Sequence, residues 1–266
     1  MKFSLALAQI IGSRENQEDA CAIRSDLSTV LQAGETDVQR GEGQDTLTAV
    51  LCDGMGGHAS GEVASAIATK LFIASFTPDT VRHRPVKDAL YQACEEANRA
   101  IRERMVEDAE TRGMGTTLVG IHCANDRMNW ISIGDSHLLL LRKNRLTKLN
   151  QDHSMKPVIE RMVTQGIISR EEALAHPERN ALRSVLVGGE VELVDQGIPE
   201  FVLQRGDVVL LASDGIDIIP QEIVAISLKQ GLLSSPASSV ARLLKSAKQF
   251  GGNSLDNTTV AVIAVR

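Results

Sequence analysis

Six acidic residues stand beside apolar, strand-like runs of the sequence, either after a run or shortly before one. An acid at the end of an apolar strand lies at the rim of the core, and several such rims can converge at one edge of a β-sandwich. Carboxylates held close together repel one another unless a cation neutralises them. Such oxygen ligands suit Mg²⁺ or Mn²⁺ better than Zn²⁺, and the histidines and cysteines show no zinc-ligand spacing. The acids are Glu18, Asp19, Asp53, Asp135, Asp214 and Asp256.

One of these acids, Asp53, opens the glycine-rich segment Asp53-Gly54-Met55-Gly56-Gly57-His58. The glycines let the backbone turn sharply and can leave a carbonyl oxygen exposed to a metal. A single Asp-Gly pair, such as Asp214-Gly215, is by itself most often only a turn. Only the joint pattern of the acidic segments indicates more than turns.

Short apolar runs rich in Val, Ile and Leu predict β-strands along most of the chain. Glu62–Phe76 and Val86–Met105 instead carry apolar residues at helical spacing. Lys143-Asn144 predicts a tight hairpin turn because Asn readily adopts a positive φ. The polar stretch Gly34–Gln44 is expected to be a surface loop. Strands are expected at Phe3–Gln9, Leu47–Cys52, Thr116–Cys123, Met128–Ile133, His137–Arg142, Asp207–Ala212 and Thr258–Val265.

The order of these elements lacks the strict strand–helix alternation of a parallel doubly wound sheet. It favours an α+β fold, with a central antiparallel β-sandwich flanked by helices in α-β-β-α layers. No linker or internal repeat divides the chain, so residues 1–266 are expected to form one domain with an insertion at about residues 154–180.

The composition limits the expected partners. The chain has 28 basic and 34 acidic residues, and its formal net charge of −6 disfavours binding to nucleic acid or to an anionic membrane surface. No apolar stretch approaches the roughly 18–20 residues that span a bilayer. The four cysteines form no CxxC motif and are expected to be buried, reduced thiols. We therefore expect a cytoplasmic protein with no membrane and no nucleic-acid partner.

Seven segments of the chain carry a family resemblance: Arg14–Asp19, Asp53–His58 with Gly61-Glu62, Gly115-Thr116-Thr117, Gly134-Asp135-Ser136, Asp152-His153-Ser154, Ser213-Asp214-Gly215 and Asp256-Asn257-x-Thr259. Their order resembles that of the metal-dependent Ser/Thr protein phosphatases, the type 2C or PPM family. The resemblance spans nearly the whole chain. The insertion at residues 154–180 resembles the flap of the bacterial branch of this family.

This resemblance implies a centre that binds two Mn²⁺ or Mg²⁺ ions tightly. Asp53 would bridge both ions, and the Gly54 carbonyl would hold one of them. Asp214 and Asp256 would hold the other. Two further acids, Glu18 and Asp19, would act largely through metal-bound waters. Two cations about 3.5–4 Å apart can lower the pKa of a shared water and stabilise its in-line attack on phosphorus.

The resemblance also implies roles for three other residues. Arg14 would grip the substrate phosphate, because a guanidinium can bond two of its oxygens at once. His58 would donate a proton to the departing serine or threonine oxygen. Asp135, together with Asp214, would hold a third, weaker metal ion.

The implied substrates are phosphoserine and phosphothreonine in proteins, and an implied partner is a Ser/Thr kinase whose products the enzyme reverses. Two alternatives stay open: a two-metal hydrolase of small phosphate esters or diesters, and a non-catalytic relative that only binds phosphoproteins. The chain departs from the family pattern at His137, where many relatives have Arg. It also has Ser184–Val187 where bacterial relatives commonly have Arg-Ala-Leu-Gly. These departures bear on substrate choice and on the flap, and they leave the acids intact.

Overall fold

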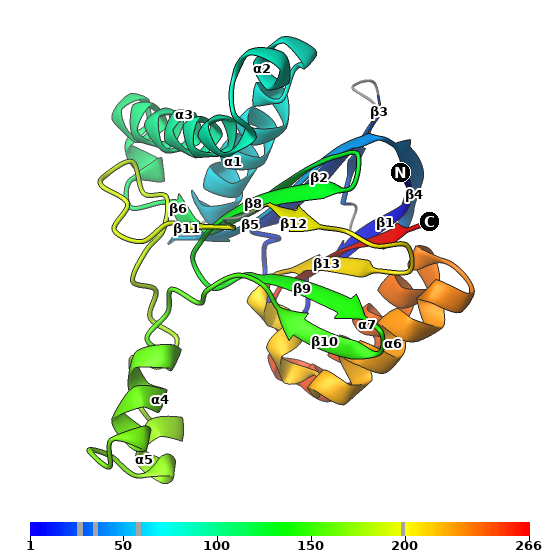
Figure 1. Ribbon diagram of the computed structural model, residues 1–266. Helices are drawn as coiled ribbons and strands as arrows, with labels where there is room; N and C mark the ends of the chain where they lie inside the picture. The colour runs from blue at the N-terminus through cyan, green and yellow to red at the C-terminus, as the bar shows by residue number, and fades with distance from the viewer. Residues whose placement is uncertain (26–28, 34–36, 57–59, 198–199) are drawn as a thin grey trace.

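Two antiparallel sheets lie face to face in the computed structural model, which describes residues 1–25, 29–33, 37–56, 60–197 and 200–266 (Figure 1). The first sheet has the strand order β10 (Arg145–Lys148), β9 (His137–Arg142), β13 (Val208–Ala212), β14 (Thr258–Val265), β1 (Lys2–Ile10) and β4 (Gln39–Gln44). The second has the order β11 (Asp195–Gln196), β8 (Arg127–Ile133), β7 (Leu118–Ala124), β5 (Thr46–Met55), β2 (Asp19–Ser25) and β3 (Thr29–Gln32), with β12 (Phe201–Val202) on β8 and β6 (Gly115–Thr116) on β5.

Helices cover the outer face of each sheet. The second sheet is covered by α1 (Ser60–Ser75) and α3 (Val86–Glu107), and the first by α6 (Gln221–Leu233) and α7 (Pro236–Gly251). The expected α-β-β-α layering is thus confirmed. The remaining helical segments are α2 (Pro78–His83), α4 (Lys156–Thr164), α5 (Arg170–Leu174), and the 3₁₀ turns η1 (Ala109–Thr111), η2 (Asp214–Ile218) and η3 (Gly252–Ser254).

Strand β1 shows how the layers follow from the sequence. Phe3, Leu5 and Leu7 point between the two sheets, and their large side chains fill the central core. Ala6 and Ala8 alternate with them and face the helices, where their small side chains let α7 pack closely. Because both faces of the strand are covered, nearly all of its residues are buried.

The segment around residues 154–180 projects from the sandwich and carries α4 and α5 (Figure 1). Its root is a short ladder in which the Met155 N–H donates to the Ala181 carbonyl at 2.9 Å and the Arg183 N–H donates to the His153 carbonyl at 2.8 Å. The His153 N–H in turn donates to the Gly134 carbonyl at 3.0 Å. The root of this segment, residues 154–180, which we refer to as the flap, is therefore attached to the turn that follows β8.

Two expectations from the sequence were wrong. The stretch Gly34–Gln44 is not wholly a loop, because its second half forms β4 and pairs with β1. Polar residues suit this strand because it lies at the sheet edge and exposes alternate side chains. The segment 221–251, for which no helix was expected, forms α6 and α7. The predicted hairpin is confirmed, since Lys143 and Asn144 connect β9 to β10 with φ of 50° and 67°.

None of the helices in the described part of the chain is long and apolar enough to cross a membrane. All four cysteines, Cys21, Cys52, Cys94 and Cys123, are buried free thiols, as expected.

Candidate active site

A cavity of about 350 Å³ opens at one edge of the sandwich, and five of the six acids singled out from the sequence border it. The sixth, Asp19, is 4% exposed and lies directly opposite Asp53 in the ladder of β2 and β5. The fold thus brings together side chains that are more than 200 residues apart. The acids bordering the cavity are Glu18, Asp53, Asp135, Asp214 and Asp256, and Arg14 and Gly54 also border it.

The backbone of Asp53 is fixed from two sides. Its N–H donates to Thr117 Oγ1 at 3.0 Å, and its carbonyl accepts from the Thr116 hydroxyl at 2.9 Å. At the next residue a side chain is impossible, because a Cβ on Gly54 would lie 2.2 Å from the Gly61 carbonyl oxygen. The glycine therefore allows the start of α1 to pack against the end of β5.

Asp214 lies at the junction where β13 ends and η2 begins. The preceding residue, Ser213, accepts a hydrogen bond from the Thr259 N–H at 3.0 Å and donates one to Asp19 Oδ2 at 2.8 Å. This serine hydroxyl links β14, β13 and β2 beneath the cavity. The sequence reasoning missed its role, although Ser213 stands in the recognised Ser-Asp-Gly segment.

The Arg14 loop is held by Asn257, another residue whose role the sequence reasoning missed. The Asn257 side-chain amide donates to the carbonyls of Ile11 and Asn16 at 2.8 and 3.0 Å, and its Oδ1 accepts from the Glu18 N–H at 2.8 Å. The loop thereby stays against the strand that follows Asp256. The Arg14 guanidinium pairs with Asp256 Oδ2 at 2.5 Å and remains 58% exposed.

The buried carboxylates are electrostatically unfavourable as they stand. Burial, followed by the charges of Asp19 and Asp214, raises the pKa of Asp53 well above its usual range. Burial also raises the pKa of Asp19 to about 6. The pKa of Asp214 rises to about 7, first through burial and then through the charge of Asp135. A cluster with these properties favours the binding of protons or of metal cations.

A divalent cation fits the chemistry of this donor set. Within the described part of the chain, Asp19 Oδ1 is buried without a hydrogen-bond partner, so the burial of this carboxylate oxygen is poorly compensated. Among the described residues, however, no three His, Cys, Asp or Glu side chains already surround a single point closely enough to hold a metal. Cations of the chain itself contact two of the acids instead: Arg14 pairs with Asp256, and Lys156 Nζ lies 3.5 Å from Asp135 Oδ2.

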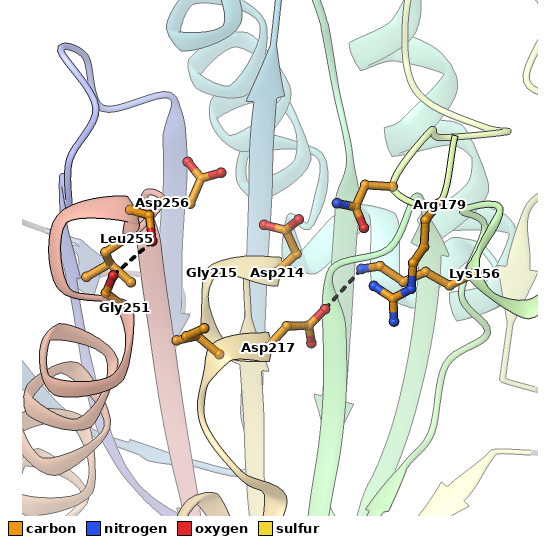
Figure 2. A pocket seen from close by; sticks show the side chains of 11 residues that line it. Lys156, Arg179, Asp214, Gly215, Asp217, Gly251, Leu255 and Asp256 are labelled. Atoms are coloured by element: carbon orange, nitrogen blue, oxygen red, sulfur yellow. Dashed lines mark hydrogen bonds and ion pairs between the residues drawn. The ribbon is translucent and has the colours of Figure 1, made fainter. Parts of the chain in front are cut away.

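A second hollow, of about 330 Å³, adjoins the acids on the flap side (Figure 2). Lys156 and Arg179 border it from the flap, and Asp214 and Asp217 border it from η2. The Lys156 ammonium lies 3.0 Å from Asp217 Oδ2, and His137 Nε2 lies 2.8 Å from Asp217 Oδ1. Burial alone would raise the pKa of Asp217, but the contacts with His137 and then Lys156 hold this pKa well below its usual value. Neither Lys156 nor Asp217 was singled out from the sequence.

The structure thus brings eight of the nine predicted site residues to one edge of the sandwich. The ninth, His58, lies outside the described residues.

Comparisons with known proteins identify the family of this chain. A sequence model of the protein phosphatase 2C family matches residues 33–249. The chain is 35% identical to the Ser/Thr protein phosphatase PstP of Mycobacterium tuberculosis over 92% of its own length, and it spans 44% of the length of that relative. It is 33% identical to the Ser/Thr phosphatase stp of Listeria monocytogenes, over 80% of this chain and 82% of the relative.

Solved structures of the mycobacterial enzyme have the same fold. The crystal structure of the M. tuberculosis phosphatase PstP/Ppp covers all of both chains with a TM-score of 0.78 and 30% identity. A PstP catalytic domain in complex with two manganese ions also covers all of both chains, with a TM-score of 0.73 and 29% identity. The chain belongs to the protein phosphatase 2C family.

Proposed function

We propose that this protein is a metal-dependent protein Ser/Thr phosphatase that hydrolyses phosphoserine and phosphothreonine in proteins. The observation that carries the proposal is the convergence of buried, mutually repelling carboxylates with an exposed Arg14 at one cavity. Family membership and the named Ser/Thr phosphatases among the relatives support it. The chain comprises the catalytic domain, and the segment at about 154–180 is its flap.

Two Mn²⁺ or Mg²⁺ ions are the cofactors that this donor set suits. Asp53 and the Gly54 carbonyl would hold one ion and Asp214 and Asp256 the other, with Asp53 shared between them. Glu18 and Asp19 would act largely through metal-bound waters. Bound there, the ions would neutralise the carboxylates and activate a water for in-line attack on phosphorus. The relative with two manganese ions supports this assignment.

Arg14 is the residue that binds the phosphate of the substrate. Its guanidinium is more than half exposed, so it can turn from Asp256 toward the cavity without unfolding the loop that Asn257 holds. A guanidinium can bond two phosphate oxygens side by side, which fixes the orientation of the phosphoryl group. We assign His58, from the glycine-rich segment, as the proton donor to the leaving oxygen.

The partners of such an enzyme are phosphoproteins and a Ser/Thr kinase whose products it reverses. The flap presents the half-buried Arg179 and the exposed Asn180 beside the second hollow, where a protein substrate can contact them. The buried free thiols support an intracellular, cytoplasmic site of action, because reducing compartments preserve unpaired cysteines.

Phosphate release from a phosphothreonine peptide tests the proposal. We expect release that requires Mn²⁺, stops with chelator and is absent in Asp53→Asn, which removes one charge and keeps the size of the side chain. An exposed carboxylate elsewhere provides the matched control Asp37→Asn. Nucleotides and an aryl phosphate, assayed in parallel, separate the protein phosphatase from a hydrolase of small phosphate esters. Turnover of the peptide by Asp53→Asn at the wild-type rate would refute the metal assignment.

A further inference from the structure

Lys156 is a largely buried cation that the catalytic assignment does not use. It is the first residue of α4, at the root of the flap, and its side chain is 16% exposed. The side chain reaches away from the flap toward the catalytic edge, where Nζ lies 3.0 Å from Asp217 Oδ2 (Figure 2). The same Nζ lies 3.5 Å from Asp135 Oδ2. One ammonium group thus connects the flap, the turn after β8 and the η2 turn that begins with Asp214.

The two acids that Lys156 contacts require a nearby positive charge. The Asp135 side chain is only 5% exposed, and Asp214 stands three residues before Asp217 in the same turn. The negative charge of Asp217 acts on Asp135, whose burial leaves little water to screen it, so the two carboxylates repel each other without a counter-charge. His137 contacts Asp217 Oδ1, so Oδ2 is left for Lys156.

The same contact holds the flap. The main-chain ladder at the flap root consists of the Met155–Ala181 and Arg183–His153 hydrogen bonds. Beyond it, α4 and α5 pack chiefly against each other. The side chain of Lys156 therefore adds a connection from the flap to η2, between residues 61 positions apart in the sequence.

We propose that the Lys156 ammonium serves as the counter-cation of Asp135 and Asp217. This ammonium takes the position that a further divalent cation would otherwise occupy. It also fixes the flap root to the catalytic edge. The inference rests on the proposed function, in which two metal ions are bound by the neighbouring acids. It replaces the expectation of a third, weaker metal ion at Asp135 by a side chain of the chain itself.

The replacement follows from the coordination needs of the two kinds of cation. Mg²⁺ and Mn²⁺ require about six oxygen ligands, most of them water where the protein offers few. An ammonium with three N–H donors is satisfied by two carboxylates and one further acceptor. A tethered ammonium also needs no free ion in solution, so the charge of these acids stays neutralised at low metal concentration.

Metal stoichiometry tests the counter-cation directly. Bound Mn²⁺ is counted by equilibrium dialysis and by electron paramagnetic resonance in wild type, Lys156→Met, Lys156→Arg and the exposed-lysine control Lys70→Met. We expect Lys156→Met to bind one more equivalent of Mn²⁺ than wild type, with low affinity, and Lys156→Arg and Lys70→Met to match wild type. The double variant Lys156→Met/Asp217→Asn should lose the extra equivalent. Equal Mn²⁺ stoichiometry in wild type and Lys156→Met overturns the proposal.

Hydrogen exchange of the metal-free protein tests the anchor without any metal. The amides of Met155 and Arg183, which form the root ladder, should exchange several-fold faster in Lys156→Met and in Asp217→Asn than in wild type. Exchange in Lys156→Arg and Lys70→Met should be unchanged. Because this readout involves neither metal nor turnover, its failure is distinct from a failure of the proposed function. Unchanged exchange at the flap root in both Lys156→Met and Asp217→Asn contradicts the anchoring role.

Discussion

Removing one charge from the acidic cluster should stabilise the metal-free protein while destroying its activity. In the folded protein, burial and then the charge of Asp135 raise the pKa of Asp214 to about 7 from an ordinary 3.8. Between these two values the folded state keeps a proton that the unfolded state has lost. The metal-free protein therefore loses stability as the pH rises from about 4 to about 7, and the full loss of unfolding free energy is present above about pH 7.

The size of the effect follows from the same two pKa values. They differ by about 3 pH units, and each unit corresponds to about 1.4 kcal/mol, which gives an upper bound of about 4 kcal/mol at pH 8. Asp214 borders an open cavity, so water lowers the cost of its charge. We expect Asp214→Asn to stabilise the metal-free protein by about 2–4 kcal/mol at pH 8 and by about 1 kcal/mol at pH 5. For a chain of this size the larger figure corresponds to a rise in Tm of about 5–10 °C.

The assay is thermal and urea unfolding at pH 5 and pH 8 in chelator, repeated with saturating Mn²⁺. Added Mn²⁺ should reverse the order of stability, because wild type gains the free energy of binding and Asp214→Asn binds more weakly. The exposed-carboxylate variant Asp37→Asn should behave as wild type throughout. If Asp214→Asn is less stable than wild type at pH 8 in chelator, Asp214 stabilises the fold itself, and the reasoning is refuted.

The positions of the clustered acids could be predicted because they depend on local sequence. A strand such as Leu47–Cys52 ends where its apolar run ends, and the acid that follows has to lie at the rim of the core. Antiparallel pairing then brings such rims together, as in the register that sets Asp19 opposite Asp53. The sequence could not supply this register, because it depends on which strands become neighbours.

Elements at the edges of the fold were harder to predict. Strand β4 is polar and contains Gly41 and Gly43, a composition typical of loops, and it is a strand only because β1 offers an open edge. Helix α7, in contrast, has sequence features from which it could have been predicted. Ser235 caps its first turn by accepting from the Ser238 N–H, Pro236 follows at the first helical position, and Val240, Leu243, Leu244 and Ala247 are spaced to bury one face.

The contacts that support the site depend on side chains distant in sequence. Nothing local distinguishes Lys156 from other surface lysines, because its partners Asp135 and Asp217 come from the turn after β8 and from η2. The role of Asn257 was likewise invisible, since it holds the loop of residues 11–18 at the other end of the chain. Such residues become identifiable only once the sheet register is known.

Three further predictions concern substrate binding, the flap and the core. Arg14→Ala should raise KM more than it lowers kcat, with a loss of about 2–3 kcal/mol in kcat/KM, because the guanidinium binds the phosphate in both ground and transition states; an unaltered KM with a large fall in kcat would contradict this role. Replacing residues 157–179 by a short linker should reduce the rate of hydrolysis of phosphoproteins more than that of an aryl phosphate. Equal losses of rate on both substrates would show that the flap forms part of the catalytic site itself. Finally, His122 should make the protein acid-sensitive. It is buried with Nδ1 2.9 Å from Thr48 Oγ1, and burial, followed by the charge of Arg24, lowers its pKa from 6.5 to about 4. The unfolded chain takes up a proton in this window and the folded protein does not, so stability falls as the pH drops from about 6.5 to about 4, by up to about 3 kcal/mol. His122→Asn keeps an acceptor for the Thr48 hydroxyl and removes the titration, so its free energy of unfolding, measured in urea at pH 6.5 and pH 4.5, should fall less than that of wild type. An identical fall in both proteins would mean that His122 is already protonated in the folded state.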